Sequence, residues 1–247
     1  MRSGSVITTI AKRELAAYFE SPVAYVFLVV YLLLAGFFTF SLGGFFEMGE
    51  ASLNAFFNWV PWLFLFLVPA VGMRLWSEER RQGTMELLLT LPVTAWQAIL
   101  AKFLASWIFL GIALLLTFPL VITANWLGDP DNGVIVAGYV GSLLLAGAFL
   151  SIASLTSALT RNQVIAFIVA LVLCMLLILV GFAPVTNLLA RFAGPALVEA
   201  ISRLSVLTHF EGFQKGVLDS RDLIYFLSVM TFALFTTGVV IRNHRAG

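Results

Sequence analysis

The sequence predicts an all-α polytopic membrane protein with six transmembrane helices. Of its 247 residues, 61% are hydrophobic and only 11% are charged, whereas soluble domains carry roughly a quarter charged residues. Six apolar runs are long enough to cross the hydrocarbon core, which takes roughly 20 residues of helix. None of these runs contains Asp, Glu, Lys, Arg or His. They are apolar on all sides, which favours helices over the alternating strands of a membrane barrel.

The six predicted spans follow one another along the chain with mostly short connections. They are Pro22–Phe46, Phe56–Met73, Phe103–Leu127, Val134–Thr160, Val164–Phe182 and Leu223–Ile241. The first span lies behind a charged stretch and is longer than a signal-peptide core of roughly 7–15 residues. We therefore interpret it as a retained span.

The distribution of basic residues orients the spans. If the N-terminus is cytoplasmic and six spans alternate, most of the 14 Lys and Arg residues fall on the inner side, as the positive-inside rule requires. The outer side then holds Arg191, Arg203, Lys215 and Arg221. We therefore expect both termini to be cytoplasmic.

The chain is interpreted as a single transmembrane domain over residues 1–247, with three informative segments outside the spans. These segments are 5–20, 76–98 and 183–222. In the first, Val6, Ile10 and Phe19 can share a helical face opposite Lys12 and Glu14. This pattern is typical of an amphipathic helix lying in the membrane interface; the alternative is an ordinary cytosolic lead-in.

The second segment connects spans two and three on the inner side. Ser77 is expected to cap a short helix that Gly83 ends, and a further short helix is expected before Pro92. Thr94 and Gln97 have the spacing of a capping box that starts the third span. The segment therefore reads as short helices with defined ends.

The third segment lies on the outer side, and two short helices dipping toward the membrane are expected in it. Pro195 suits a helix start, and Glu199 and Arg203 have the i,i+4 spacing of an ion pair. Thr208 and Glu211 have capping-box spacing and are expected to start the second helix.

Several kinds of chemistry lack their sequence signatures. There is no GxxxxGK[ST] phosphate loop, GxSxG or HExxH, so we expect no ATP site, enzymatic activity, cofactor or metal site in this chain. The lone Cys174 and the distant His209 and His244 form no metal-ligand cluster, and His209 is interpreted as a polar loop residue. Uncharged spans argue against an ion-coupled carrier.

The fourth span carries a stripe of small residues on one helical face. The stripe comprises Gly147, Ser151, Ser154 and Ala158. Close helix packing is the expected role, and a polar lining for a substrate is the alternative.

Residues 79–92 read E-R-R-Q-G-T-M-E-L-L-L-T-L-P. This stretch resembles the E-x-x-x-G-T-x-E-x-L-L-x-x-P signature of type-2 ABC exporter permeases. The matching positions are Glu79, Gly83, Thr84, Glu86, Leu88, Leu89 and Pro92. Residues 209–222 are similar to the same region of gliding-motility and copper-enzyme-maturation permeases.

The resemblance implies that the inner segment is a coupling helix seated on a separate ATPase subunit, which binds ATP and Mg²⁺. The expected contact comprises Glu78, Glu79, Gly83, Thr84, Met85, Glu86, Leu87 and Leu88. The alternative is that these acids only solvate a membrane-proximal loop. The resemblance also implies two ATPase copies, a second permease chain that is most simply an identical copy, a bacterial inner membrane, and room for an accessory extracytoplasmic subunit. The formal net charge of +1 shows no basic excess, so no nucleic-acid partner is expected.

An apolar outer gate is a further expectation. It would be formed by Phe45, Phe46, Phe56, Phe57 and Phe213. With 23 phenylalanines in the chain, core or lipid-facing packing explains each of them equally well.

The sequence thus indicates the permease subunit of an ATP-driven ABC exporter. The alternative is a membrane scaffold that anchors a protein machine driven mechanically by an associated ATPase. The substrate stays open among lipids, glycans, peptides and sulfur compounds.

Overall fold

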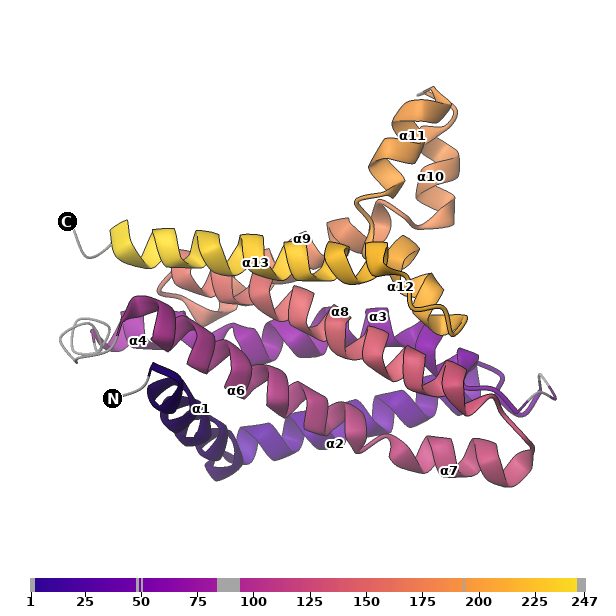
Figure 1. Cartoon of the computed structure of the whole chain (residues 1–247), viewed down its shortest axis with the longest axis horizontal. Helices are drawn as coiled ribbons and strands as arrows, with labels where there is room; N and C mark the ends of the chain where they lie inside the picture. Colours follow the sequence, from indigo (N-terminus) through magenta and orange to yellow (C-terminus); the bar gives the residue numbers. More distant parts are fainter. Residues whose placement is uncertain (1–2, 48, 50, 84–93, 193, 244–247) are drawn as a thin grey trace.

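The computed structural model describes residues 3–47, 49, 51–83, 94–192 and 194–243, and in these ranges the regular structure is helical throughout. The order of helices is α1 (Ser3–Glu20), α2 (Pro22–Phe37), the π-helix η1 (Phe38–Leu42), α3 (Asn54–Gly72), α4 (Arg74–Gln82), α6 (Ala95–Leu115), α7 (Phe118–Leu127), α8 (Asn132–Leu159), α9 (Gln163–Leu179), α10 (Ala183–Leu189), α11 (Pro195–Ser202), α12 (Val206–Gln214) and α13 (Ser220–Asn243). Most of them run side by side in an elongated bundle (Figure 1).

Five of the six predicted spans correspond to helices or joined helices that, within the described residues, are long and apolar enough to cross a membrane. The predicted fifth span corresponds to α9, which passes the same test only together with α10, and the two helices are bent by 70°. The start of α1, the end of α13 and all of α4 lie at one end of the bundle (Figure 1). We call this the α4 end and the opposite one the α12 end.

The first span is shorter than predicted. It ends at Leu42 rather than Phe46, because Gly43 and Gly44 follow and Gly44 adopts a φ of +61°, in the left-handed region. Phe45 and Phe46 therefore lie after the helix; Phe45 is buried and Phe46 is 62% exposed.

The third span begins eight residues earlier than predicted, at Ala95. The predicted capping box is confirmed: Thr94 Oγ1 accepts from the Gln97 N–H, and the Gln97 side chain accepts from the Thr94 N–H. The early start places Lys102 two turns inside the helix. The span breaks at Thr117 into α6 and α7.

Helix α8 is the centre of the bundle and packs against α3, α6, α9, α12 and α13. Glycines on α8 allow this close approach. A Cβ added at Gly138 would lie 2.5 Å from Phe57, and one at Gly141 would lie 2.5 Å from Phe213. The predicted small-residue stripe is buried along its length, which confirms helix packing as its role.

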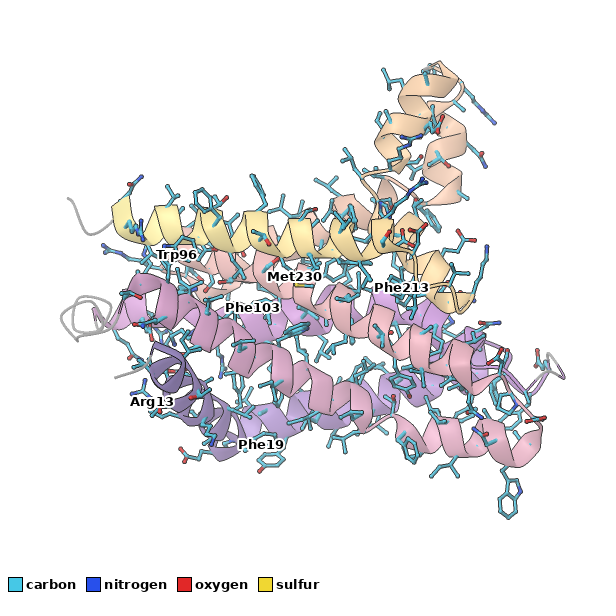
Figure 2. The ribbon with its side chains drawn as sticks, in the orientation of Figure 1. Arg13, Phe19, Trp96, Phe103, Phe213 and Met230 are labelled. Carbon is cyan, nitrogen blue, oxygen red and sulfur yellow. The ribbon has the colours of Figure 1, made fainter. Side chains whose placement is uncertain are left out.

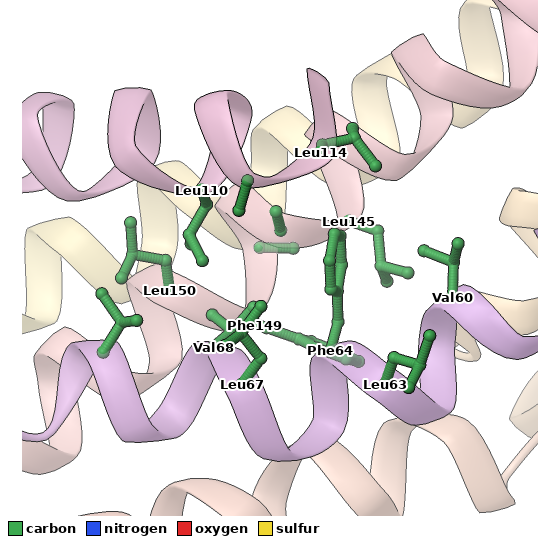
Figure 3. Close-up of a cluster of buried hydrophobic side chains, with 14 of the residues drawn as sticks. Val60, Leu63, Phe64, Leu67, Val68, Leu110, Leu114, Leu145, Phe149 and Leu150 are labelled. Carbon is green, nitrogen blue, oxygen red and sulfur yellow. The ribbon is translucent and has the colours of Figure 1, made fainter. Parts of the chain in front are cut away.

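The core between α3, α6 and α8 is built from interlocking aliphatic and aromatic side chains (Figure 3). Phe64 and Val68 of α3 meet Leu110 of α6 and Phe149 of α8, and all four are fully buried. Trp96 of α6, Met230 of α13 and Phe213 of α12 lie in that order along α13 (Figure 2). Between helices in lipid, such packing contributes dispersion contacts rather than a hydrophobic driving force.

Two prolines lie inside α3, at Pro61 and Pro69. Each lacks the N–H that would bond to the carbonyl four residues earlier, which weakens the helix locally. The helix nevertheless continues through Met73, whose N–H bonds to the Pro69 carbonyl at 2.8 Å. Residues 54–82 therefore run as one nearly continuous helical rod.

At the α12 end, the two predicted short helices correspond to α11 and α12, and α10 is an additional helix. Helices α10 and α11 stand away from the bundle (Figure 1). The predicted ion pair is confirmed: Arg203 Nη2 lies 2.7 Å from Glu199 Oε1. The capping box predicted at Thr208 is wrong, because Ser205 caps α12 by accepting from the Leu207 N–H and the helix is already under way at Thr208.

Candidate functional site

The candidate site is the set of contacts that hold α4 in the bundle, which we call the α4 junction. It comprises Glu14 of α1, Trp76 and Glu79 of α4, Lys102 of α6, and Ser154 and Ser157 of α8. Helix α4 ends at Gly83, which adopts a left-handed φ of +71° and donates its N–H to the Glu79 carbonyl. The chain then enters the segment that resembles a coupling helix.

On one side, α4 is hydrogen-bonded to α8. The Trp76 indole Nε1 donates to Ser154 Oγ at 3.0 Å. The backbone N–H groups of Trp76 and Ser77 both donate to Ser157 Oγ at 3.0 Å, and Ser157 Oγ donates to the Met73 carbonyl at 2.8 Å. Ser157 thus satisfies donors and an acceptor at the α3–α4 joint. The end of α4 is tied to the same helix because Arg80 donates to the Ala158 carbonyl.

Ser77 does not cap a helix, contrary to the expectation. It lies inside α4, where its hydroxyl donates to the Met73 carbonyl. Helix α4 follows α3 after the single residue Met73, and the N–H groups of Trp76 and Ser77 near its start have Ser157 Oγ of α8 as their acceptor.

On the other side, a buried charge cluster links α4 to α1 and α6. Lys102 Nζ lies 2.8 Å from Glu79 Oε1 and 3.2 Å from Glu14 Oε2, and its side chain is only 8% exposed. The ammonium also lies 5.7 Å from the centre of the Trp76 ring, within the range of a cation–π contact. Three helices therefore share one buried ammonium, and removing it would leave two carboxylates facing each other.

Helix α1 is held against α6 next to this cluster. The Tyr18 ring stacks on Phe109 with centroids 4.9 Å apart, and the Tyr18 hydroxyl lies 2.8 Å from Ser106 Oγ. Ser106 donates its own hydrogen to the Lys102 carbonyl, so Tyr18 is the donor in the shared bond. Burial raises the pKa of the Tyr18 hydroxyl, which keeps the donor protonated.

The predicted coupling residues divide between the described and the undescribed parts of the chain. Glu79 points into the α4 junction, whereas Glu78 is partly exposed and pairs loosely with Arg81 at 3.9 Å. Gly83 ends α4. The remaining predicted contacts lie outside the described residues; they are Thr84, Met85, Glu86, Leu87 and Leu88.

The predicted gate residues make three separate sets of ring contacts. Phe45 and Phe46 contact each other and Phe40, Phe56 and Phe57 contact Tyr139 of α8, and Phe213 contacts Phe226 of α13. All but Phe46 are buried within the chain's own core. An outer gate stays a prediction.

At the α12 end, His209 joins α12 to α13. It was expected to be a loop residue, but it lies inside α12 with Nδ1 2.7 Å from Asp222 Oδ1 and Nε2 3.0 Å from the Arg203 carbonyl. Its ring stacks on Tyr225 at 3.9 Å. These contacts anchor the base of the α10–α11 projection.

Sequence reasoning missed Lys102 as a functional residue because the third span was taken to begin just after it. The capping box at Thr94 was the available signal, since a helix starting there carries Lys102 toward the bundle. Ser157 gave no comparable signal, because a serine in an apolar helix normally bonds to its own backbone.

Comparison with known proteins bears on the whole chain. Residues 8–236 match the model of a family described as ABC-2 family transporter protein. No curated protein sequence matches the chain.

Proposed function

The chain belongs to the ABC-2 family of transporter proteins. Within that family, we propose that this chain is an export permease, and that its α4 transmits the conformational change of a separate ATPase subunit. As a member of that family it is a multi-pass membrane subunit of a transporter. The observation that carries the proposal is the α4 junction. It binds α4 to three other helices immediately before the segment that resembles the family's coupling signature.

The proposed mechanism is transmission of force through a rigid contact. ATP and Mg²⁺ bind to the partner ATPase, and closure of two ATPase copies displaces the segment after Gly83. Helix α4 is hydrogen-bonded to α8 and ion-paired to Lys102 of α6, which also pairs with Glu14 of α1. A displacement of the end of α4 therefore moves those helices together. Two permease chains, most simply identical copies, would then open a path between them.

The proposed orientation places the α4 end on the cytoplasmic side of a bacterial inner membrane. Arg80 and Arg81 of α4 and Arg242 in the last turn of α13 support this orientation. Helix α4 and the end of α13 lie at the α4 end (Figure 1), and basic residues favour the cytoplasmic side. Both termini are then cytoplasmic, and the α10–α11 projection is extracytoplasmic.

The first test is co-purification of a tagged chain with its nucleotide-binding partner in detergent. The variant combines Gly83→Pro, which is incompatible with a φ of +71°, with Glu86→Arg. The matched control is Glu211→Arg, a charge reversal on exposed α12. We expect the wild-type chain and the control to retain an ATPase and the double variant to lose it. If no ATPase co-purifies with the wild-type chain or with the Glu211→Arg control, the export proposal is wrong.

A second candidate function is a membrane scaffold for a protein machine. It is favoured by the α10–α11 projection, where Phe192 is 85% exposed and Leu188 and Leu197 are more than half exposed, a surface suited to an accessory extracytoplasmic subunit. Reconstitution of the permease with its ATPase in vesicles separates the two candidates. An exporter shows ATP turnover stimulated by a transported compound, whereas a scaffold keeps its partners without such stimulation.

A further inference from the structure

The C-terminal end of α11 is held by side chains from the two helices that follow it. The backbone carbonyls of three consecutive residues, 202–204, each accept a hydrogen bond from α12 or α13. The bonds run from Thr208 Oγ1 to Ser202 at 3.0 Å, from His209 Nε2 to Arg203 at 3.0 Å and from Tyr225 Oη to Leu204 at 2.6 Å. The last carbonyls of a helix have no partner within the helix. These three bonds therefore fix how the α10–α11 projection leaves the bundle (Figure 1).

His209 differs from the other two donors because its protonation state changes near neutral pH. Imidazole gains or loses a proton between about pH 5 and 8, whereas threonine and tyrosine hydroxyls keep their hydrogen in that range. The other ring nitrogen of His209, Nδ1, lies 2.7 Å from Asp222 Oδ1 of α13. The two side chains are only 17% and 16% exposed, so solvent contributes little to either contact.

The two acceptors around His209 define the protonation state that this arrangement requires. A backbone carbonyl and an ionised carboxylate can only accept hydrogen bonds, and a neutral imidazole has a single N–H. Both contacts are therefore made together only when the His209–Asp222 pair holds one proton more than a neutral ring and a carboxylate. The position favours this proton, because a cation at the C-terminal end of a helix is stabilised by the helix dipole.

The close approach of Asp222 depends on a glycine. A Cβ at Gly212 would lie 2.8 Å from Asp222 Oδ2, so a larger residue there would push the carboxylate away from the imidazole. The ring of His209 is held on its face by Tyr225, whose ring stacks on it with centroids 3.9 Å apart. The imidazole is thus fixed between two acceptors by groups that do not titrate in the same pH range.

The other charged groups of the neighbouring helices have partners of their own. In the described residues these groups are the exposed pairs Arg203–Glu199 and Lys215–Glu211, and Asp219, which accepts from the N–H of Arg221. Helices α3, α8 and α9 also pack against α12, and they contain no acidic, basic or histidine residue. Asp222 is the charged side chain that contacts the His209 ring.

We propose that His209 is a pH-sensitive clamp on the α10–α11 projection, closed on the Arg203 carbonyl when protonated and open when neutral. In the neutral ring, the remaining N–H stays with the carboxylate of Asp222, which is the stronger acceptor. Nε2 then presents a lone pair to the Arg203 carbonyl, and that bond is lost. The bond therefore stabilises the end of α11 at low pH and is lost as the pH rises. The clamp does not depend on the proposed ATPase coupling, because every group in it belongs to this chain.

The test measures backbone hydrogen exchange of α11 in the full-length chain in detergent, at about pH 5.5 and about pH 8, on either side of the imidazole range. Rates are expressed as protection factors, which removes the intrinsic pH dependence of exchange, and the amides of α6 are the internal reference. The first variant, His209→Phe, keeps a ring against Tyr225 and removes both hydrogen bonds. The matched control, Tyr225→Phe, removes the bond to the Leu204 carbonyl, which does not titrate in this range.

We expect protection of α11 in the wild-type chain to be roughly 3- to 10-fold lower at the higher pH, as for the loss of one hydrogen bond. In His209→Phe it should be low at both pH values. In Tyr225→Phe it should fall at both pH values and keep the wild-type ratio between them. Equal protection of the wild-type chain at the two pH values overturns the proposal. So does a wild-type ratio in His209→Phe, because another group is then responsible.

A second variant covers the case in which His209→Phe does not fold. His209→Gln keeps an N–H donor that can reach one of the two acceptors, but its amide does not titrate. We expect it to fold and to show the same protection of α11 at both pH values. A loss of protection at the higher pH as large as in the wild-type chain would contradict the assignment of the clamp to His209.

Discussion

Replacing Lys102 by Met tests whether the buried charge cluster holds the α4 junction together. The substitution keeps the length and apolar character of the side chain but removes the ammonium that lies 2.8 Å from Glu79 and 3.2 Å from Glu14. Two carboxylates are then left close together without the ammonium between them, and Glu14 keeps its pair with the exposed Arg13. Breaking a buried ion pair in this way costs about 3–5 kcal/mol. We expect about 3 kcal/mol, because the two glutamate side chains remain 20% and 21% exposed and so keep some contact with solvent.

The assay is a denaturant titration of the purified chain in detergent micelles, followed by tryptophan fluorescence. Lys215→Met is the matched control: Lys215 pairs with Glu211 at 2.6 Å, but the two side chains are 66% and 61% exposed. An exposed pair of this kind contributes about 0–1 kcal/mol. A loss in Lys102→Met no larger than in Lys215→Met would refute the reasoning.

A compensated variant separates the charge effect from a packing effect. Lys102→Met combined with Glu14→Gln and Glu79→Gln contains no charge in the cluster. Because neutral replacement of a whole buried ion cluster is often close to neutral in stability, we expect this variant to recover most of the loss. If it is no more stable than Lys102→Met alone, the cost lies in packing and not in unpaired charge.

Three further predictions concern other contacts of the bundle. Ser157→Ala removes the acceptor of two N–H groups at the α3–α4 joint and should lower the free energy of unfolding by about 1–3 kcal/mol. Ser228→Ala is the control: it removes an exposed hydrogen bond within one helix and should leave the free energy of unfolding nearly unchanged in the same denaturant titration. Gly141→Ala places a Cβ 2.5 Å from the Phe213 side chain of α12 and should lower the free energy of unfolding by about 1–3 kcal/mol. Gly36→Ala is the control, because no atom lies within 4 Å of its added carbon, and it should not lower the stability. An equal effect of the two substitutions on the thermal unfolding midpoint would contradict the packing argument. Asp222→Asn removes the charged partner of the α12 imidazole and should speed hydrogen exchange of the backbone amides in α12, with no change in α4 as the internal control.

The spans could be predicted because their signal is simple. A run of about 20 apolar residues is required for any helix that crosses lipid, and α8 and α13 follow such runs closely. The end of the first span was placed too far because apolar residues continue past Gly43 and Gly44. Composition alone does not reveal that Gly44 has a left-handed backbone conformation. The break at Thr117 lies within an uninterrupted apolar run, so hydropathy gave no sign of it.

The contacts of the candidate site were harder to predict, for a physical reason. Glu79 and Gly83 were found through a local motif, because they lie only four residues apart in the chain. Glu79 pairs with Lys102 of α6, which also pairs with Glu14 of α1. These residues are far apart in the sequence, and their meeting depends on how the helices pack. Ser157 illustrates the same limit: its role is set by the α3–α4 joint opposite it, and nothing in its own helix marks it.

The two prolines of α3 give the α3–α4 rod the properties of a lever. Pro69 weakens the rod near its middle, and the arm from Pro69 to Gln82 is about 20 Å long at 1.5 Å per residue. A tilt of about 10° at that point displaces the tip by roughly 3–4 Å, which is close to the rise of two residues along a helix. A small angular change at the proline is thus converted into a movement as large as a side-chain contact, delivered where α4 ends.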